Sequence, residues 1–148
     1  MRSTAQPILK NLAGLLRRPR SAMHSPPIKI LGLLGLDPGR GLLADICRRN
    51  GWDLVLSETC EDARADLIRL KPQIVLCDRD LPGADWRDVV QALASVRGCG
   101  CIILLSRVAD DPLWNEVVHR GGYEVLSKPL REDHVRRAVK LASAYWEQ

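Results

Sequence analysis

The sequence predicts an α/β fold: a doubly wound, five-stranded parallel sheet in the order 2-1-3-4-5, with helices on both faces. Two observations carry this prediction. From residue 28 onward, five short apolar runs alternate with segments of helical periodicity, which is typical of repeated strand–helix units. The run over residues 74–77 holds four apolar residues and is bounded by proline-containing turns, as expected of a strand buried on both faces. Units of this length fit the stated strand order.

The first strand–helix unit follows Ile28. Its strand is expected over residues 30–34, and Asp37 is expected to cap the helix with Pro38 at the first helical position. The spacing of apolar residues predicts an inward-facing stripe on this helix that consists of Leu42, Leu43, Ile46 and Cys47. Asn50-Gly51 ends the helix, because glycine readily takes the left-handed conformation.

The second unit has its strand over residues 54–56. Thr59 is expected to cap the following helix, with Asp62 three residues later as in a capping box. The dipeptide Lys71-Pro72 interrupts the helical pattern, so the helix ends there. The third strand comes next and ends at Asp78.

The last three units are read in the same way. Asp85 is expected to cap the third helix, and residues 101–106 form the fourth strand. Asp111-Pro112 is expected to open the fourth helix by a cap followed by proline, with an inward stripe of Leu113, Trp114, Val117 and Val118. The fifth strand covers residues 124–126. The last helix, about residues 131–146, is expected to bury Val135, Ala138, Val139, Ala142 and Tyr145.

The net charge of +4 comes from the N-terminal segment. Residues 1–29 hold six basic residues and no acid, so the rest of the chain carries 16 basic against 18 acidic residues. Ser25-Pro26-Pro27 separates this segment from the alternating pattern. We therefore expect a basic, disordered arm over residues 1–27 and a folded domain over residues 28–148. Contact of the arm with a membrane or a nucleic acid is a secondary alternative, and Met23 is an alternative start that would exclude residues 1–22.

Composition and length limit the class of protein. Five cysteines, an odd number in a chain without a secretory signal, indicate the reducing cytoplasm rather than a disulfide framework. No apolar run approaches the roughly 18 residues that a membrane-spanning helix needs. A chain of 148 residues is long enough for one such domain and too short for a separate output domain beside it. We therefore expect a cytoplasmic, one-domain protein without a DNA-binding domain.

Three polar residues follow three neighbouring strands of the predicted sheet. Asp78 ends the third strand, Ser106 ends the fourth, and Lys128 comes just after the fifth. In the order 2-1-3-4-5 these strand ends meet at one crevice, where open α/β sheets place their chemistry. A carboxylate can act as a nucleophile, a hydroxyl can bond a phosphoryl oxygen, and an ammonium can neutralise developing charge. The set is therefore suited to phosphoryl transfer.

The sequence around these residues resembles the receiver domains of response regulators in two-component signalling. The matching stretches are Asp78-Arg79-Asp80-Leu81-Pro82-Gly83 and Lys128-Pro129. The resemblance covers residues 28–148 and implies a flavodoxin-like fold. It also implies that Asp78 accepts a phosphoryl group from a histidine kinase or phosphotransfer protein, in contact with Ser106 and Lys128.

The same resemblance implies a signalling module rather than an enzyme. It places a downstream protein partner on the face formed by the fourth helix, the fifth strand and the fifth helix of the domain. The family commonly has an aromatic switch residue three positions before the lysine, where this chain has Val125. Tyr123 lies two residues earlier, and strand alternation predicts that it shares the face of Val125.

The chain departs from the family where receivers bind magnesium. Gly35 and Leu36 occupy the positions of the acidic pair that ends the first strand, and neither can bind a metal. Of the usual carboxylates only Asp78 remains, with Asp80 and Asp37 as weak substitutes. The resemblance therefore implies weak Mg²⁺ binding and no other cofactor.

Two mechanisms and one different function stay open at this point. Asp78 either receives a phosphoryl group with weakened metal support, or the domain is a pseudo-receiver that binds a partner without phosphorylation. The remote alternative is a dinucleotide-binding domain, because residues 39–44 match the pattern G-x-G-x-x-A and Glu58 lies about twenty residues on. Against it, the predicted cap at Asp37 places Gly39 inside the first helical turn.

Overall fold

The computed structural model describes residues 26–35 and 38–147. Strands and helices alternate along the whole described chain. They are β1 (Lys29–Leu33), α2 (Pro38–Asn50), β2 (Asp53–Ser57), α3 (Cys60–Leu70), β3 (Ile74–Asp78), α4 (Trp86–Ala94), β4 (Cys101–Ser106), α5 (Asp111–His119), β5 (Glu124–Ser127) and α6 (Glu132–Trp146). The strands form one parallel sheet in the order β2-β1-β3-β4-β5, which confirms the predicted topology. The predicted arm lies outside the described residues, apart from its last two positions.

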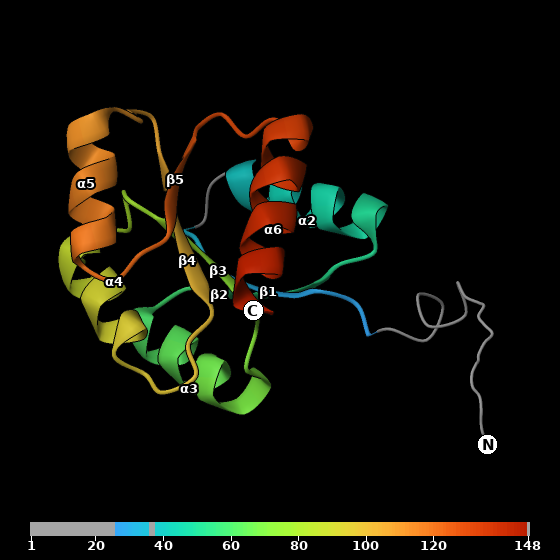
Figure 1. Cartoon of the computed structure of the whole chain (residues 1–148), viewed down its shortest axis with the longest axis horizontal. Helices are drawn as coiled ribbons and strands as arrows, with labels where there is room; N and C mark the ends of the chain where they lie inside the picture. The colour runs from blue at the N-terminus through green and yellow to red at the C-terminus, as the bar shows by residue number, and fades with distance from the viewer. Residues whose placement is uncertain (1–25, 36–37, 148) are drawn as a thin grey trace, which may run out of the picture.

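Two hydrophobic layers cover the sheet, one on each face. Helices α2 and α6 lie on one side, and α3, α4 and α5 lie on the other (Figure 1). Every residue of β3 and β4 is buried, as the apolar run in the sequence predicted. Ile74 and Leu76 pack toward α2 and α6, whereas Val75 and Cys77 pack toward the other three helices. This central position fixes Asp78 at the end of the best-buried part of the fold.

Helix caps agree with the sequence at two positions and differ at a third. The side chains of Thr59 and Asp85 accept hydrogen bonds from backbone amides in the first turns of α3 and α4, as predicted. In α5 the cap is Asp110 rather than Asp111, because the carboxylate of Asp110 accepts from the amide of Leu113 at 3.0 Å. Helix α2 begins at Pro38, but its predicted cap, Asp37, lies outside the described residues.

Some residues predicted to face inward are exposed. In α5, Leu113 and Val117 pack on the sheet while Trp114 and Val118 face solvent, because each helix buries only one narrow stripe. Leu42 in α2 and Tyr145 in α6 are exposed as well. Tyr145 still contacts the domain, since the centroid of its ring lies 5.2 Å from that of Tyr123.

A glycine allows β4 to start close to the segment before β3. A β-carbon on Gly100 would lie 2.2 Å from the carbonyl oxygen of Gln73, far inside van der Waals contact. The next amide, that of Cys101, donates a hydrogen bond to the same oxygen at 2.9 Å. Any side chain at Gly100 would therefore separate the two central strands at this end.

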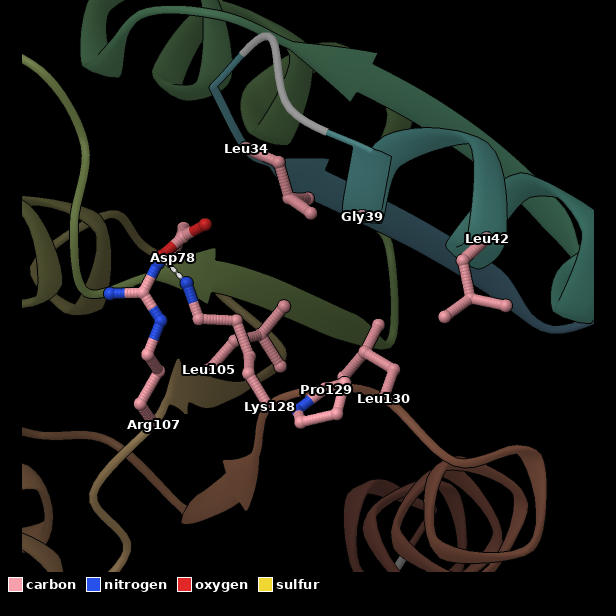
Figure 2. A pocket seen from close by; sticks show the side chains of 9 residues that line it. All are labelled: Leu34, Gly39, Leu42, Asp78, Leu105, Arg107, Lys128, Pro129 and Leu130. Atoms are coloured by element: carbon pink, nitrogen blue, oxygen red, sulfur yellow. Dashed lines mark hydrogen bonds and ion pairs between the residues drawn. The ribbon is translucent and has the colours of Figure 1, made fainter.

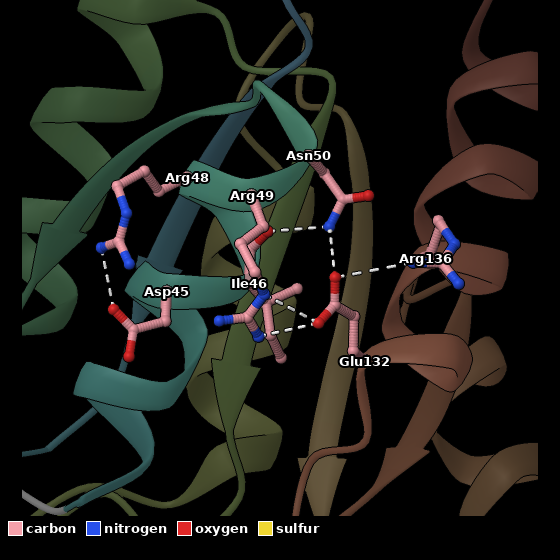
Figure 3. Close-up of polar contacts among 7 residues, drawn as sticks. All are labelled: Asp45, Ile46, Arg48, Arg49, Asn50, Glu132 and Arg136. Atoms are coloured by element: carbon pink, nitrogen blue, oxygen red, sulfur yellow. Dashed lines mark hydrogen bonds and ion pairs between the residues drawn. The ribbon is translucent and has the colours of Figure 1, made fainter.

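Glu132 connects the two helices that share one layer. At the start of α6, its carboxylate accepts hydrogen bonds from Arg49 at 2.7 and 2.9 Å and from Asn50 at 3.1 Å, both at the end of α2 (Figure 3). Arg136 approaches the same carboxylate at 3.5 Å. The hydrogen bonds from Arg49 lower the pKa of Glu132 below its usual value.

Candidate functional site

Asp78 ends β3 with its carboxylate buried at the carboxyl edge of the sheet. The residue is 2% exposed. Its Oδ1 accepts a hydrogen bond from the Nζ of Lys128 at 2.7 Å and another from the backbone N–H of Asp80 at 2.9 Å. A buried carboxylate is costly unless it is paired, and Lys128 and this amide offset the cost of burying Asp78 here.

Lys128 reaches Asp78 because the backbone after β5 is held against β4. The N–H of Lys128 donates to the carbonyl oxygen of Ser106 at 2.9 Å. The ammonium then lies between two carboxylates, 2.7 Å from Asp78 and 3.6 Å from Asp80. The structure therefore brings together Asp78 and Lys128, as the sequence predicted.

Ser106 lies at the end of β4 but makes contacts that the sequence did not predict. Its Oγ accepts hydrogen bonds from the Nη1 of Arg79 at 3.3 Å and from the backbone N–H of Val108 at 3.1 Å. The residue is fully buried. Arg79, which directly follows Asp78, was missed because nothing in the sequence shows which way its long side chain turns.

A cavity of about 510 Å³ opens beside Asp78. Figure 2 shows Asp78, Lys128 and Arg107 at one end of it, with the side chains of Leu34, Leu42 and Leu130 around the rest. Leu105, Pro129 and the backbone of Gly39 complete the lining. The cavity thus has a small charged end and a larger apolar part.

Solved structures of similar shape decide the type of fold. A two-component response regulator from Clostridium difficile aligns with a TM-score of 0.73 and 21% identity, over 82% of this chain and 99% of that chain. The chemotaxis protein CheY4 of Vibrio cholerae aligns with a TM-score of 0.74 and 14% identity, over 79% and 99%. This chain has the receiver-domain fold. No family model and no curated protein sequence matches it.

Another receiver domain of the same fold contains a metal ion. It belongs to a sensor histidine kinase from Pseudomonas aeruginosa PAO1 and has magnesium coordinated in its active-site cleft. It aligns with a TM-score of 0.71 and 17% identity, over 80% of this chain and 99% of that chain.

The two carboxylates described at this crevice already have a cationic partner. Within residues 26–35 and 38–147, no three His, Cys, Asp or Glu side chains are grouped so that they could hold a metal ion. Asp78 and Asp80 share the ammonium of Lys128, and Asp80 is further approached by Arg107 at 4.0 Å. Asp37, the other predicted ligand, lies outside the described residues.

The segment around β5 has an aliphatic residue on one face of the sheet and an aromatic residue on the other. Val125 in β5 is partly buried against the layer of α3, α4 and α5. Tyr123 packs against the opposite layer, with α2 and α6, so the predicted common face is wrong. The reason is that Tyr123 precedes β5 and lies outside the regular alternation of the strand.

The dinucleotide pattern does not form a phosphate-binding turn in this receiver fold. Gly39 and Gly41 lie within α2, which begins at Pro38, rather than at the turn between strand and helix. Glu58, the candidate ribose-binding acid, lies 3.4 Å from the guanidinium of Arg40.

Among the residues that the structure describes, no helix is both long and apolar enough to cross a membrane.

Proposed function

We propose that this protein is a response-regulator receiver in phosphorelay signalling and that Asp78 is its phospho-acceptor. The observation that carries the proposal is the buried pair at the end of β3, where the carboxylate of Asp78 lies 2.7 Å from the ammonium of Lys128. Phosphoryl transfer depends on a positioned nucleophile and on neutralisation of charge, and this pair supplies both.

In this proposal the two carboxylate oxygens of Asp78 have different tasks. Both hydrogen bonds described for the carboxylate fall on Oδ1. Oδ2 is then the oxygen that attacks phosphorus. With a donor such as acetyl phosphate, a bond forms between Oδ2 and phosphorus, the bond from phosphorus to the acetyl oxygen breaks, and acetate leaves.

Lys128 and Ser106 contact the transferred group in this proposal. The side chain of Lys128 is 15% exposed and lines the cavity, so its ammonium can follow the new negative charge. The Oγ of Ser106 already accepts two hydrogen bonds, from Arg79 and from Val108. Its own hydrogen is therefore the group that it offers to a phosphoryl oxygen.

Magnesium support is expected to be weak. A receiver binds this ion through carboxylates together with phosphate oxygens and water, and Gly35 and Leu36 replace the acidic pair. The ammonium of Lys128 already lies between Asp78 and Asp80, the two carboxylates described there. The same observation favours a second candidate, a pseudo-receiver that binds its partner without phosphorylation.

In both candidates a partner protein docks on the face formed by α5, β5 and α6. Four large apolar residues on these helices are exposed: Trp114, Val118, Leu141 and Tyr145. Exposed large apolar residues on these two helices favour an interaction surface there. In the phosphorylated candidate, a histidine kinase or phosphotransfer protein supplies the phosphoryl group.

Phosphorylation of the intact protein separates the two candidates. The wild type, incubated with acetyl phosphate and Mg²⁺, is expected to gain one base-labile phosphoryl group slowly, and Asp78→Asn is expected to gain none. The variant Gly35→Asp/Leu36→Asp is expected to react on the order of tenfold faster, because it regains metal ligands. A β-carbon at Gly35 would meet Pro82 at an ordinary 3.4 Å, so the first change fits.

Mass spectrometry of the intact proteins measures the reaction. Adding Asp78→Asn to the double variant is the matched control, because it keeps the new acids and removes the acceptor. No label on Asp78 in the wild type would favour the pseudo-receiver. No label in the double variant either would show that the crevice lacks the geometry for phosphoryl transfer.

A further inference from the structure

The apolar part of the cavity has no role in phosphoryl transfer. A phosphoryl group on Asp78 would fill only the charged end, and the cavity measures about 510 Å³. Leu34, Leu42, Leu105 and Leu130 line it, together with Pro129. This volume and this balance of apolar walls with a few polar groups are typical of sites for small organic ligands.

Leu42 shows that the apolar lining is more than an extension of the core. Leu34 and Leu105 are fully buried and belong to the core layer of α2 and α6. Leu42 is 38% exposed, lies on α2 and faces the cavity opposite the charged end (Figure 2). A leucine in this position leaves apolar surface in water unless a ligand covers it.

Arg107 is the cation of the cavity that is available to a negative charge on that ligand. Lys128 and Arg107 line the charged end with Asp78, and Asp80, which does not line the cavity, is the second carboxylate near these two cations. The Asp78–Lys128 pair is tight at 2.7 Å, whereas Arg107 is 80% exposed and meets Asp80 only at 4.0 Å. An exposed pair of this kind is weak, so Arg107 can exchange Asp80 for a ligand carboxylate with two parallel hydrogen bonds.

We infer that the cavity binds a small amphipathic carboxylate, with the apolar body against Leu42 and Leu130 and the acidic group at Arg107. This inference goes beyond the proposed function and does not require that Asp78 be phosphorylated. It assigns a ligand-responsive role to the crevice, because the bound molecule lies beside Asp78 and competes with a phosphoryl donor for the charged end.

Octanoate is a suitable probe, and octanol and acetate are the two control ligands. Titration of the full chain, followed by calorimetry and by amide chemical shifts, is expected to give saturable octanoate binding with a dissociation constant on the order of 1 mM or below. Octanol, which lacks the charge, and acetate, which lacks the body, are expected to bind at least about tenfold more weakly.

Three variants locate the binding. Arg107→Gln is expected to weaken octanoate about tenfold without changing octanol, and Leu42→Gln is expected to weaken both. Leu141→Gln is the matched control, since Leu141 is also exposed but lies on α6 outside this cavity. Circular dichroism checks that each variant folds. Absence of saturation, or equal effects of the two leucine variants, would overturn the inference.

Phosphorylation is measured separately on the same samples. Octanoate is expected to slow labelling of Asp78 by acetyl phosphate in proportion to its occupancy. Octanoate binding without any labelling would refute the proposed function and leave the ligand site standing. Labelling of Asp78 without octanoate binding would refute the ligand site and leave the proposed function standing.

Discussion

The pair of Asp78 and Lys128 makes a prediction about stability that does not depend on the signalling role. Lys128→Met keeps the length and apolar stem of the side chain but removes the ammonium. The carboxylate of Asp78, 2% exposed, would then keep one described hydrogen bond, from the N–H of Asp80 at 2.9 Å. Removing one partner of a buried pair costs about 3–5 kcal/mol, and the remaining amide favours the lower end, about 3 kcal/mol.

Urea unfolding followed by tryptophan fluorescence measures this loss, which corresponds to a fall in Tm of roughly 10 °C. Arg107→Met is the control, because its 80% exposed pair with Asp80 at 4.0 Å should contribute less than about 0.5 kcal/mol. Adding Asp78→Asn to Lys128→Met should recover most of the stability, since an amide needs no counter-charge. A loss below about 1 kcal/mol in Lys128→Met, or an equal loss in the control, would refute the reasoning.

Two further predictions test other parts of the fold by thermal unfolding. Gly100→Ala should lower the free energy of unfolding by more than about 3 kcal/mol, because its β-carbon would lie 2.2 Å from a backbone oxygen. Gly41→Ala is the contrasting variant. It has open space around it inside α2, so it should raise the free energy of unfolding by about 0.5–1 kcal/mol. Glu132→Gln should lower the Tm by a few degrees at pH 7. Because the folded pKa of Glu132 is lowered, its contribution is complete above the pKa of the unfolded state and disappears as the pH falls through the folded value. The difference in Tm between the two proteins should therefore shrink as the solution is made acidic.

The sheet could be predicted from sequence because its determinants are local. Uninterrupted apolar runs and glycine or proline boundaries are visible in single segments, and β3 lies where they indicated. Cap assignment was less certain where neighbours are chemically equal. Asp110 and Asp111 can both cap a helix, and only the backbone geometry shows that Asp110 does so.

Only those residues of the site that lie at strand ends could be predicted from the sequence. Strand order placed Asp78 next to Lys128, and the structure has them in contact. The apolar part of the cavity was not predicted, because Leu42 has the same helical spacing as residues of the core. Whether such a leucine meets the sheet or projects over its edge depends on how the helix lies, which periodicity does not encode. Arg107 could not be predicted as a residue of the site, because it belongs to no sequence motif.

The backbone segment that carries Lys128 is held at both of its ends. At one end its backbone N–H is hydrogen-bonded to the carbonyl oxygen of Ser106 in β4. Four residues later in the chain, Glu132 is held by Arg49 and Asn50. Leu130, midway between these anchor points, is itself buried. If the Lys128 backbone moves further than these few residues can accommodate, the start of α6 must therefore move with it. Because Glu132 is bonded to the end of α2, that helix moves as well. Both helices of this layer then shift together relative to the sheet.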